Sequence, residues 1–236
     1  MNNNARLYLF PVPLSDNPVT EVLPAHNIEL IKTVKYFIVE NLRSARRFLK
    51  QCDRSIDIDS LTFFTLNEHT DASELTPMLA PMEAGNDVGI ISEAGCPAVA
   101  DPGADIVAIA QQRGYTVVPL VGPSSILMGV MASGFNGQSF AFNGYLPIDQ
   151  GARTARLKEL ERRIIREHQT QIFIETPYRN NRLIAELCRS LPGNMRLCVA
   201  SDITGARQSI VTLPLSKWAK REYNYDKTPT IFLLYS

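Results

Sequence analysis

Short apolar runs alternate with segments of mixed polarity along the whole chain, and many of the runs end in glycine or proline. Two such runs, residues 88–91 and 116–121, enclose an amphipathic segment over residues 104–113. Apolar runs this short, bounded by Gly and Pro, are typical of buried parallel strands. The pattern therefore predicts a strand, a helix and a second strand, with a loop after each strand.

The same alternation continues on both sides of this segment. Further strands are expected over residues 7–12, 34–39, 62–66, 140–145, 171–174, 197–201, 209–213 and 230–234. Further helices are expected over residues 24–33, 75–83, 126–132, 153–168 and 181–190. Because strands and helices alternate, the chain is predicted to have an α/β fold.

Small residues fill the loops after strands 88–91 and 116–121. The first loop contains Gly95-Cys96-Pro97-Ala98-Val99, and the second contains Gly122-Pro123-Ser124-Ser125. We expect the two strands to be neighbours, so that both loops lie at the carboxyl edge of the sheet, where open α/β sheets bind ligands. Neither loop contains the Lys of a Walker-type phosphate site, which favours an uncharged or cationic ligand with a ribose or an adenine. The alternative is two ordinary turns between strand and helix.

Composition and charge narrow the class of protein. The 236 residues are 45% hydrophobic, as in globular proteins, and the apolar runs are too short to span a membrane. The four cysteines lack the spacing of a metal site, and without a signal peptide a cytoplasmic location is expected. Cys96 is either a nucleophile or, more simply, a small buried side chain.

Charge is distributed unevenly although the net charge is zero. Residues 1–120 contain nine Lys and Arg against fifteen Asp and Glu, and residues 121–236 contain fifteen against nine. This asymmetry indicates two domains, the basic one facing a polyanion. A second basic feature is a stripe at helical spacing, Arg43, Arg46, Arg47 and Lys50, which suits phosphate groups. In both cases the alternative is a solvated helix face without a partner.

Specific words in the sequence resemble a known family. Ser92-Glu93-Ala94-Gly95-Cys96-Pro97, the following Ala100-Asp101-Pro102-Gly103, and Val118-Pro119-Leu120-Val121-Gly122-Pro123-Ser124 resemble the tetrapyrrole methylase superfamily of S-adenosylmethionine (SAM)-dependent methyltransferases. Within it, the chain is most similar to the 16S ribosomal RNA cytidine 2'-O-methyltransferase branch. The resemblance extends over nearly the whole chain.

Other segments match that branch or depart from it. The matches include Leu7-Tyr8-Leu9, Glu40 with Arg43, Glu68-His69, and Glu175-Thr176-Pro177-Tyr178-Arg179. The departures are Ser15 in place of Gly, Asn41 in place of Asp, and Ser201-Asp202 in place of Arg-Glu. Loss of the Gly at position 15 removes free access to positive φ, and Asn41 lacks the charge of the family's Asp.

The resemblance implies two α/β domains, residues 1–121 with a mainly parallel sheet and residues 122–236 with a mixed sheet, with a cleft between them. It implies SAM as the cofactor, no metal, and a homodimer. The residues that it assigns to SAM binding are Leu14, Gly95, Cys96, Pro97, Ala98, Val99, Ser124, Ser125, Ile126, Ala200, Pro229 and Thr230. Candidate catalytic residues are Glu40, His69 and Glu175, and candidate substrate contacts are Arg43, Arg46, Arg47, Tyr178 and Arg179.

The function that this resemblance implies is 2'-O-methylation of a cytidine in the 16S RNA of the small ribosomal subunit. A hydroxyl acceptor needs a base, and the sequence does not choose among the three candidates. The departures at Ser15, Asn41 and Ser201-Asp202 leave two alternatives open. One is a methylase of a tetrapyrrole or another acceptor, and the other is a catalytically silent module that binds SAM or RNA.

Overall fold

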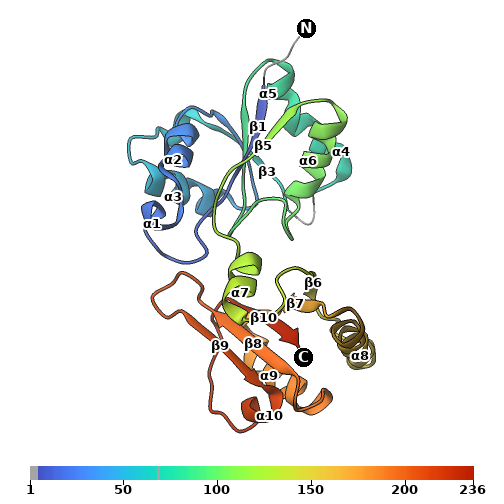
Figure 1. Ribbon diagram of the computed structural model, residues 1–236. Coiled ribbons are helices and arrows are strands. Elements are labelled where there is room, and N and C mark those ends of the chain that lie inside the picture. Colours follow the sequence, from blue (N-terminus) through green and yellow to red (C-terminus); the bar gives the residue numbers. More distant parts are fainter. Residues whose placement is uncertain (1–4, 68–69) are drawn as a thin grey trace. The chain divides into compact units, whose positions relative to one another are not determined.

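The computed structural model describes residues 5–67 and 70–236, which fold as two compact units, Met1–Ser124 and Ser125–Ser236 (Figure 1). The domain boundary predicted from the sequence lies three residues earlier, between Val121 and Gly122. The strands of the first unit are β1 (Arg6–Phe10), β2 (Tyr36–Val39), β3 (Thr62–Thr65), β4 (Val88–Ile91) and β5 (Thr116–Pro119). Its α-helices are α1 (Val19–Val22), α2 (Ala25–Ile31), α3 (Leu42–Cys52), α4 (Ala72–Leu75), α5 (Ala80–Glu83) and α6 (Gly103–Gln112), and η1 (Ile58–Ser60) and η2 (Thr76–Leu79) are 3₁₀ turns.

The first sheet is parallel, with the strand order β3-β2-β4-β1-β5. This order corrects one expectation, because β4 and β5 are not neighbours. Strand β1 lies between them and hydrogen-bonds to both, with Leu9 opposite Ile90 on one side and Pro119 on the other. The loop after β1 therefore belongs to the same edge as the two small-residue loops.

Alternating side chains along the parallel strands fill two cores, one on each face of the sheet. On β2, Phe37 and Val39 pack with Phe48 and Leu49 of α3, whereas Ile38 points to the opposite face. That opposite core contains Met82 of α5 and is covered by α4, α5 and α6, while α1, α2 and α3 cover the first (Figure 1). Both faces are covered, as expected of a parallel sheet with helical crossovers.

The expectation of a single helix over residues 75–83 is wrong. The chain instead forms three short pieces, α4, η2 and α5, and Pro77 and Pro81 lie at the beginnings of the second and third. Proline lacks the N–H that an uninterrupted helix needs and is tolerated in the first turn. The apolar spacing survives this interruption, because Leu79 and Met82 are both fully buried.

The second unit contains a mixed sheet with the order β6-β7-β10-β8-β9. Its strands are β6 (Phe140–Tyr145), β7 (Thr170–Ile174), β8 (Arg196–Ser201), β9 (Ser209–Pro214) and β10 (Thr230–Tyr235). Its α-helices are α7 (Ser125–Ser133), α8 (Gln150–Glu167), α9 (Asn180–Ser190) and α10 (Leu215–Trp218), and η3 (Pro177–Arg179) is a 3₁₀ turn. Strands β6 and β7 are parallel, and the other pairs are antiparallel.

Alternate side chains of β10 point to opposite faces of this second sheet. Phe232 and Leu234 enter the main core with Trp218, whose Nε1 donates a hydrogen bond of 2.9 Å to the carbonyl of Leu197. Ile231 and Leu233 point to the other face, where α7 approaches closely at Gly129. A Cβ atom at Gly129 would lie 3.2 Å from Leu233 Cδ1, so the absence of a side chain permits this close packing.

Gly89, in the middle of β4, lies where the first core is tightly packed. A Cβ atom there would lie 2.9 Å from the rings of both Phe10 and Phe37. We predict that Gly89→Ala destabilises the fold by about 1–3 kcal/mol, because these buried rings must shift to accept a methyl group. Unfolding by urea measures the loss. The control Gly137→Ala, whose Cβ would make an ordinary contact of 3.5 Å, should change stability far less. Equal effects of the two substitutions would contradict this account.

Candidate functional site

Three loops of the first unit meet at the carboxyl edge of its sheet. The loop after β1 pairs with the loop after β4, since Val12 N–H donates to the Gly95 carbonyl at 2.9 Å and Gly95 N–H donates back at 3.2 Å. A Cβ atom at Gly95 would lie 3.2 Å from Leu14 Cδ2 and 3.4 Å from the carbonyl oxygen of Pro123. The structure thus brings Leu14, Gly95 and the Pro123-Ser124 segment together, as three of the predicted cofactor contacts require.

Cys96 is oriented by the same cluster of loops. Its Sγ donates a hydrogen bond of 3.4 Å to the Pro123 carbonyl. Burial raises the pKa of the Cys96 thiol, so it remains protonated at neutral pH and is a poor nucleophile. This geometry supports the interpretation of Cys96 as a small side chain that joins two loops.

The loop after β4 has an unusual backbone. Gly95, Ala98 and Ala100 all have left-handed conformations, with φ of 72°, 64° and 57°. Positive φ is rare for alanine and costs on the order of 1–3 kcal/mol, and such strain clusters at ligand sites. Val99, between the two alanines, is 50% exposed. The loop therefore presents small side chains and backbone rather than bulky groups.

A carboxylate follows β2 directly at the same edge. Glu40 is half-buried and accepts a hydrogen bond of 3.1 Å from the N–H of Glu93, and the carboxyl group of Asp101 is close enough to influence the pKa of Glu40. Asp101 Oδ1 accepts from Gly103 N–H at 2.5 Å, whereas its Oδ2 is buried and lacks a donor among the residues that the structure describes. Burial and the neighbouring carboxylate both favour the protonated form of Glu40.

The environment of Glu40 tunes its acidity. Burial raises the pKa of Glu40 to about 7, the negative charge of Asp101 adds to the rise, and the Glu93 N–H acts in the opposite direction. A general base is most effective when its pKa lies near the working pH. Asp101 is not among the site residues predicted from the sequence, although it lies in Ala100-Asp101-Pro102-Gly103, one of the motifs that carry the family resemblance.

Asn41 has a structural role in this chain. Its side-chain oxygen accepts hydrogen bonds from the N–H groups of Arg43 at 2.9 Å and Ser44 at 3.3 Å, so it caps the N-terminus of α3. An amide performs this role without a charge. The helix that begins here positions the three arginines assigned to the substrate.

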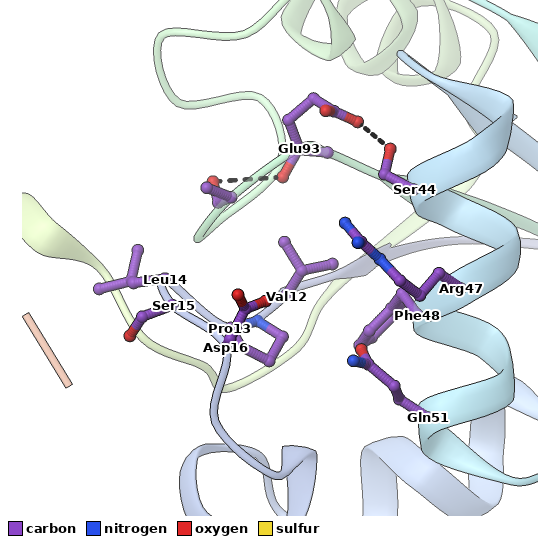
Figure 2. A pocket seen from close by; sticks show the side chains of 12 residues that line it. Val12, Pro13, Leu14, Ser15, Asp16, Ser44, Arg47, Phe48, Gln51 and Glu93 are labelled. Carbon is purple, nitrogen blue, oxygen red and sulfur yellow. Dashed lines mark hydrogen bonds between the residues drawn. The ribbon is translucent and has the colours of Figure 1, made fainter. Parts of the chain in front are cut away.

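A hollow of about 160 Å³ lies between α3 and the loops after β1 and β4 (Figure 2). Its polar lining includes Arg47, Ser44, Gln51, Asp16 and Glu93, and Ser44 Oγ donates a hydrogen bond to Glu93 Oε1. Figure 2 shows the Arg47 side chain extending from α3 toward this space. By contrast, the guanidinium of Arg46 lies over the ring of Phe63, 5.7 Å from its centroid. Of the three arginines, Arg47 is therefore the one that lines the hollow.

The remaining candidates in the first unit are placed less directly. Arg43 is exposed in the first turn of α3 and does not line this hollow. His69 lies outside the described residues, so its candidate role stays a prediction. Within residues 5–67 and 70–236, no group of three or more His, Cys, Asp or Glu side chains is arranged to hold a metal ion.

In the second unit, four of the predicted cofactor contacts lie at element ends. Ser125 and Ile126 begin α7, Thr230 begins β10, and Pro229 directly precedes that strand. Thr230 pairs with Ser201 at the end of β8, directly after the buried Ala200, and Thr230 Oγ1 donates to Ser201 Oγ at 3.0 Å. The carboxyl end of β8 and the amino end of β10 thus form one edge of the second sheet.

Glu175, at the end of β7 on this edge, is held by two arginines. Arg153 Nη2 lies 2.8 Å from Oε2, and Arg179 Nη2 lies 2.7 Å from Oε1, which also accepts from Thr176 N–H at 2.7 Å. Burial acts to raise the pKa of Glu175, but the hydrogen bonds from Arg153, Thr176 and Arg179 outweigh it and lower the pKa. Both oxygens are therefore occupied and the group stays ionised. The catalytic role of Glu175 stays a prediction.

Arg179 and Tyr178, the predicted substrate contacts of this unit, differ in surroundings. Arg179 is engaged with Glu175 as described, whereas the Tyr178 side chain is 75% exposed. An exposed tyrosine ring beside arginines is a surface on which a nucleic-acid base can stack.

Comparison with known proteins identifies the family. The family model described as "Tetrapyrrole (Corrin/Porphyrin) Methylases" matches residues 20–219. The chain belongs to this family. It is a methyltransferase with SAM as the methyl donor.

Similar proteins extend the match to nearly the full chain. One named ribosomal RNA small subunit methyltransferase I, from Vibrio cholerae serotype O1, is 27% identical over 97% of this chain and 76% of its own length. A protein of the same name from Escherichia coli O157:H7 is 24% identical, over 99% and 78%. The solved structure of the methyltransferase CobJ has a TM-score of 0.62 at 13% identity and covers 98% of this chain and 93% of its own, which confirms the two-sheet α/β fold.

The residues at the edge of the first sheet fit SAM. SAM carries a flat adenine, a ribose and a cationic sulfonium, and the loop over Gly95–Val99 consists of small or apolar residues without a lysine. A side chain at Gly95 would press on Leu14 and Pro123. The carboxylates of Glu40 and Glu93 at the same edge add negative charge, which is compatible with a cationic ligand.

The raised pKa of Glu40 gives a prediction about pH. Because the pKa of Glu40 is raised from 4.5 to about 7, the folded chain retains a proton that the unfolded chain releases between these values. The stability of the wild type relative to Glu40→Gln should therefore fall as the pH rises from about 4.5 to about 7. Thermal unfolding at a series of pH values measures this difference, and carboxyl ¹³C NMR locates the titration.

The variant Asp101→Asn provides the control for this titration. Removing the neighbouring charge should shift the titration of Glu40 to lower pH, because one cause of the raised pKa is lost. Titration of Glu40 near 4.5 in the wild-type chain would show that burial and the charge of Asp101 do not raise its pKa.

Proposed function

We propose that the chain transfers the methyl group of SAM to the 2'-hydroxyl of a cytidine in the 16S RNA of the small ribosomal subunit. The observation that carries this proposal is the match of ribosomal RNA small subunit methyltransferase I over 97% of the chain in one relative and 99% in another. The exposed cations of α3 support it, since an RNA substrate requires them.

In this proposal, Leu14, the Gly95–Val99 loop and Ser124 of the first unit contribute to SAM binding. The cofactor roles of Ser125, Ile126, Ala200, Pro229 and Thr230 stay predictions from the sequence. Bound SAM supplies an electrophilic methyl group. The chain must orient the acceptor hydroxyl, exclude water and remove the hydroxyl proton. Proximity contributes roughly 7–11 kcal/mol to such a transfer, and a base contributes about 10²–10⁴-fold.

Glu40 is the proposed base. Its carboxylate is fixed by the Glu93 N–H, and its pKa of about 7 allows it to accept a proton at neutral pH. Asp101 takes part through its negative charge, which favours the protonated form of Glu40. The arrangement gives the proton a defined place at Glu40 once it has left the hydroxyl.

We further propose a homodimer that works in the cytoplasm. Met131 and Leu127 are 81% and 53% exposed on α7 and lie one helical turn apart, which supports a subunit contact. None of the helices within the described part of the chain is long and apolar enough to cross a membrane.

The test of the proposed function is methyl transfer from radiolabelled SAM to purified small subunits that lack the modification, followed by mass spectrometry of the RNA nucleosides. We expect 2'-O-methylcytidine in 16S RNA. Glu40→Gln should slow the transfer at least about tenfold while SAM still binds, because the base is lost and the side-chain size is kept. The exposed Glu167→Gln is the matched control and should leave the rate unchanged. Methylation of another acceptor would refute the proposed substrate. An unchanged rate in Glu40→Gln would refute the role of Glu40 as the base.

Arg47 is expected to contact RNA phosphate. It lines the hollow of Figure 2 and also an adjoining hollow of about 700 Å³ that includes Lys50 and Arg54. We predict that Arg47→Ala weakens binding of the small subunit and lowers the slope of log affinity against log salt by about one. Filter binding at several salt concentrations measures both. Arg113→Ala is the control. Arg113 forms an ion pair of 2.5 Å with Glu83 and lines neither hollow. The same salt slope in the Arg47 variant as in the wild type would contradict the contact.

A further inference from the structure

A small cavity in the second unit is lined by charged side chains, of which Arg153, Arg182 and Glu186 have no part in the proposed methyl transfer. Its volume is about 90 Å³, which is room for more than one water molecule. Three guanidinium groups and two carboxylates line it together with Ile148 and Leu183. The cavity lies beside the ends of β6 and β7, since Ile148 follows β6 and Glu175 follows β7.

Glu186, on α9, lines this cavity and has one carboxylate oxygen without a donor among the described residues. The residue is only 8% exposed, and its Oε2 forms an ion pair of 3.2 Å with Arg153 Nε. Its Oε1 is buried, and the described residues provide no hydrogen-bond donor to it. The other carboxylate, Glu175, already accepts at both oxygens. A buried carboxylate oxygen without a donor is costly, so a ligand with an N–H group is favoured here.

The rim of the cavity offers a donor and an apolar surface. Arg182 is exposed and precedes Glu186 by four residues, so the two side chains are neighbours on the same face of α9. Ile148 is 80% exposed, and an apolar side chain at the rim can pack against a flat ring. The ligand should therefore combine a donor for Glu186 with an acceptor for Arg182 on one planar edge.

Among the RNA bases, cytosine best matches this requirement. Its N4 amino group is a donor, the adjacent N3 and O2 atoms are acceptors, and carboxylates accept from cytosine N4 in known recognition patterns. The small volume favours a pyrimidine over a purine. Uracil places the O4 acceptor where cytosine has the amino group, so a carboxylate would repel it.

We propose that this cavity is a cytosine-binding site for the RNA substrate, in which Glu186 Oε1 accepts a hydrogen bond from N4 and Arg182 donates to the N3 and O2 edge. The proposal rests on the proposed function only in taking RNA as the substrate. It assigns Glu186 and Arg182 as specificity-determining residues. The ion pairs of Arg153 with Glu175 and Glu186 hold the carboxylate in place.

The test uses the full chain with cytidine 5'-monophosphate and uridine 5'-monophosphate as probes. Titrations are followed by NMR of the arginine side-chain N–H groups and by calorimetry. The wild type should bind the cytidine nucleotide at least about tenfold more tightly than the uridine nucleotide. Arg182→Gln should weaken cytidine binding by about fivefold or more, whereas Arg189→Gln, an exposed arginine farther along α9 that does not line the cavity, should leave it unchanged.

Glu186→Gln tests the base preference itself. The substitution keeps the size but places an amide where a carboxylate was, and an amide can donate to uracil O4. The preference for cytidine should therefore fall to near equality or reverse. Thermal unfolding checks that the loss of the Arg153 ion pair leaves the chain folded. If it does not, Ile148→Trp, which obstructs the cavity from its exposed rim, decides the question by abolishing cytidine binding.

Each outcome bears on one proposal. Equal binding of the two nucleotides by the wild type, no detectable binding, or an Arg182→Gln variant indistinguishable from Arg189→Gln would overturn the cytosine site. Methyl transfer to small subunits, measured separately on the wild type, tests the proposed function. Failure of one proposal therefore leaves the test of the other interpretable.

Discussion

The first unit depends on the two hydrogen-bonded ladders of β1. This strand pairs with β4 on one side and β5 on the other, so that three strands end at the same edge. The Val12–Gly95 bridge extends the contact beyond the strands into the loops. Because these loops are fixed to one another by backbone hydrogen bonds, the strained conformations of Ala98 and Ala100 can persist. The candidate SAM contacts of this unit follow from that arrangement.

Two glutamates occupy equivalent positions after strands but have opposite chemistry. Glu40 is buried near another carboxyl group, and its pKa is raised to about 7. Glu175 is buried between two guanidinium groups, and its pKa is lowered. Environments that move two carboxyl groups apart in this way assign different tasks to them. Glu40 can exchange a proton at neutral pH, whereas Glu175 serves as a fixed charge that organises Arg153 and Arg179.

The ion pairs around Arg153 connect this fixed charge to the cavity on α9. Removing one partner of a buried pair leaves an uncompensated charge, which is strongly destabilising. Arg153 bridges Glu175 and Glu186, so the orientation of the Glu186 carboxylate depends on residues that are distant in sequence. A carboxylate oxygen left without a donor inside such a network is a feature of the tertiary structure that a list of charged residues does not contain.

The sequence by itself determined the α/β class, the order of nearly all strands and longer helices, and the family, because short apolar runs and the Gly- and Pro-containing words depend on local chemistry. It also selected Glu40, Gly95 and Arg47. It did not predict that β1 separates β4 from β5, since strand neighbours are chosen by long-range packing. It missed Asp101 and Glu186 for the same reason. The pKa of a carboxyl group depends on which charges and donors folding brings beside it, and only the tertiary structure places Asp101 against Glu40 and Arg153 against Glu175.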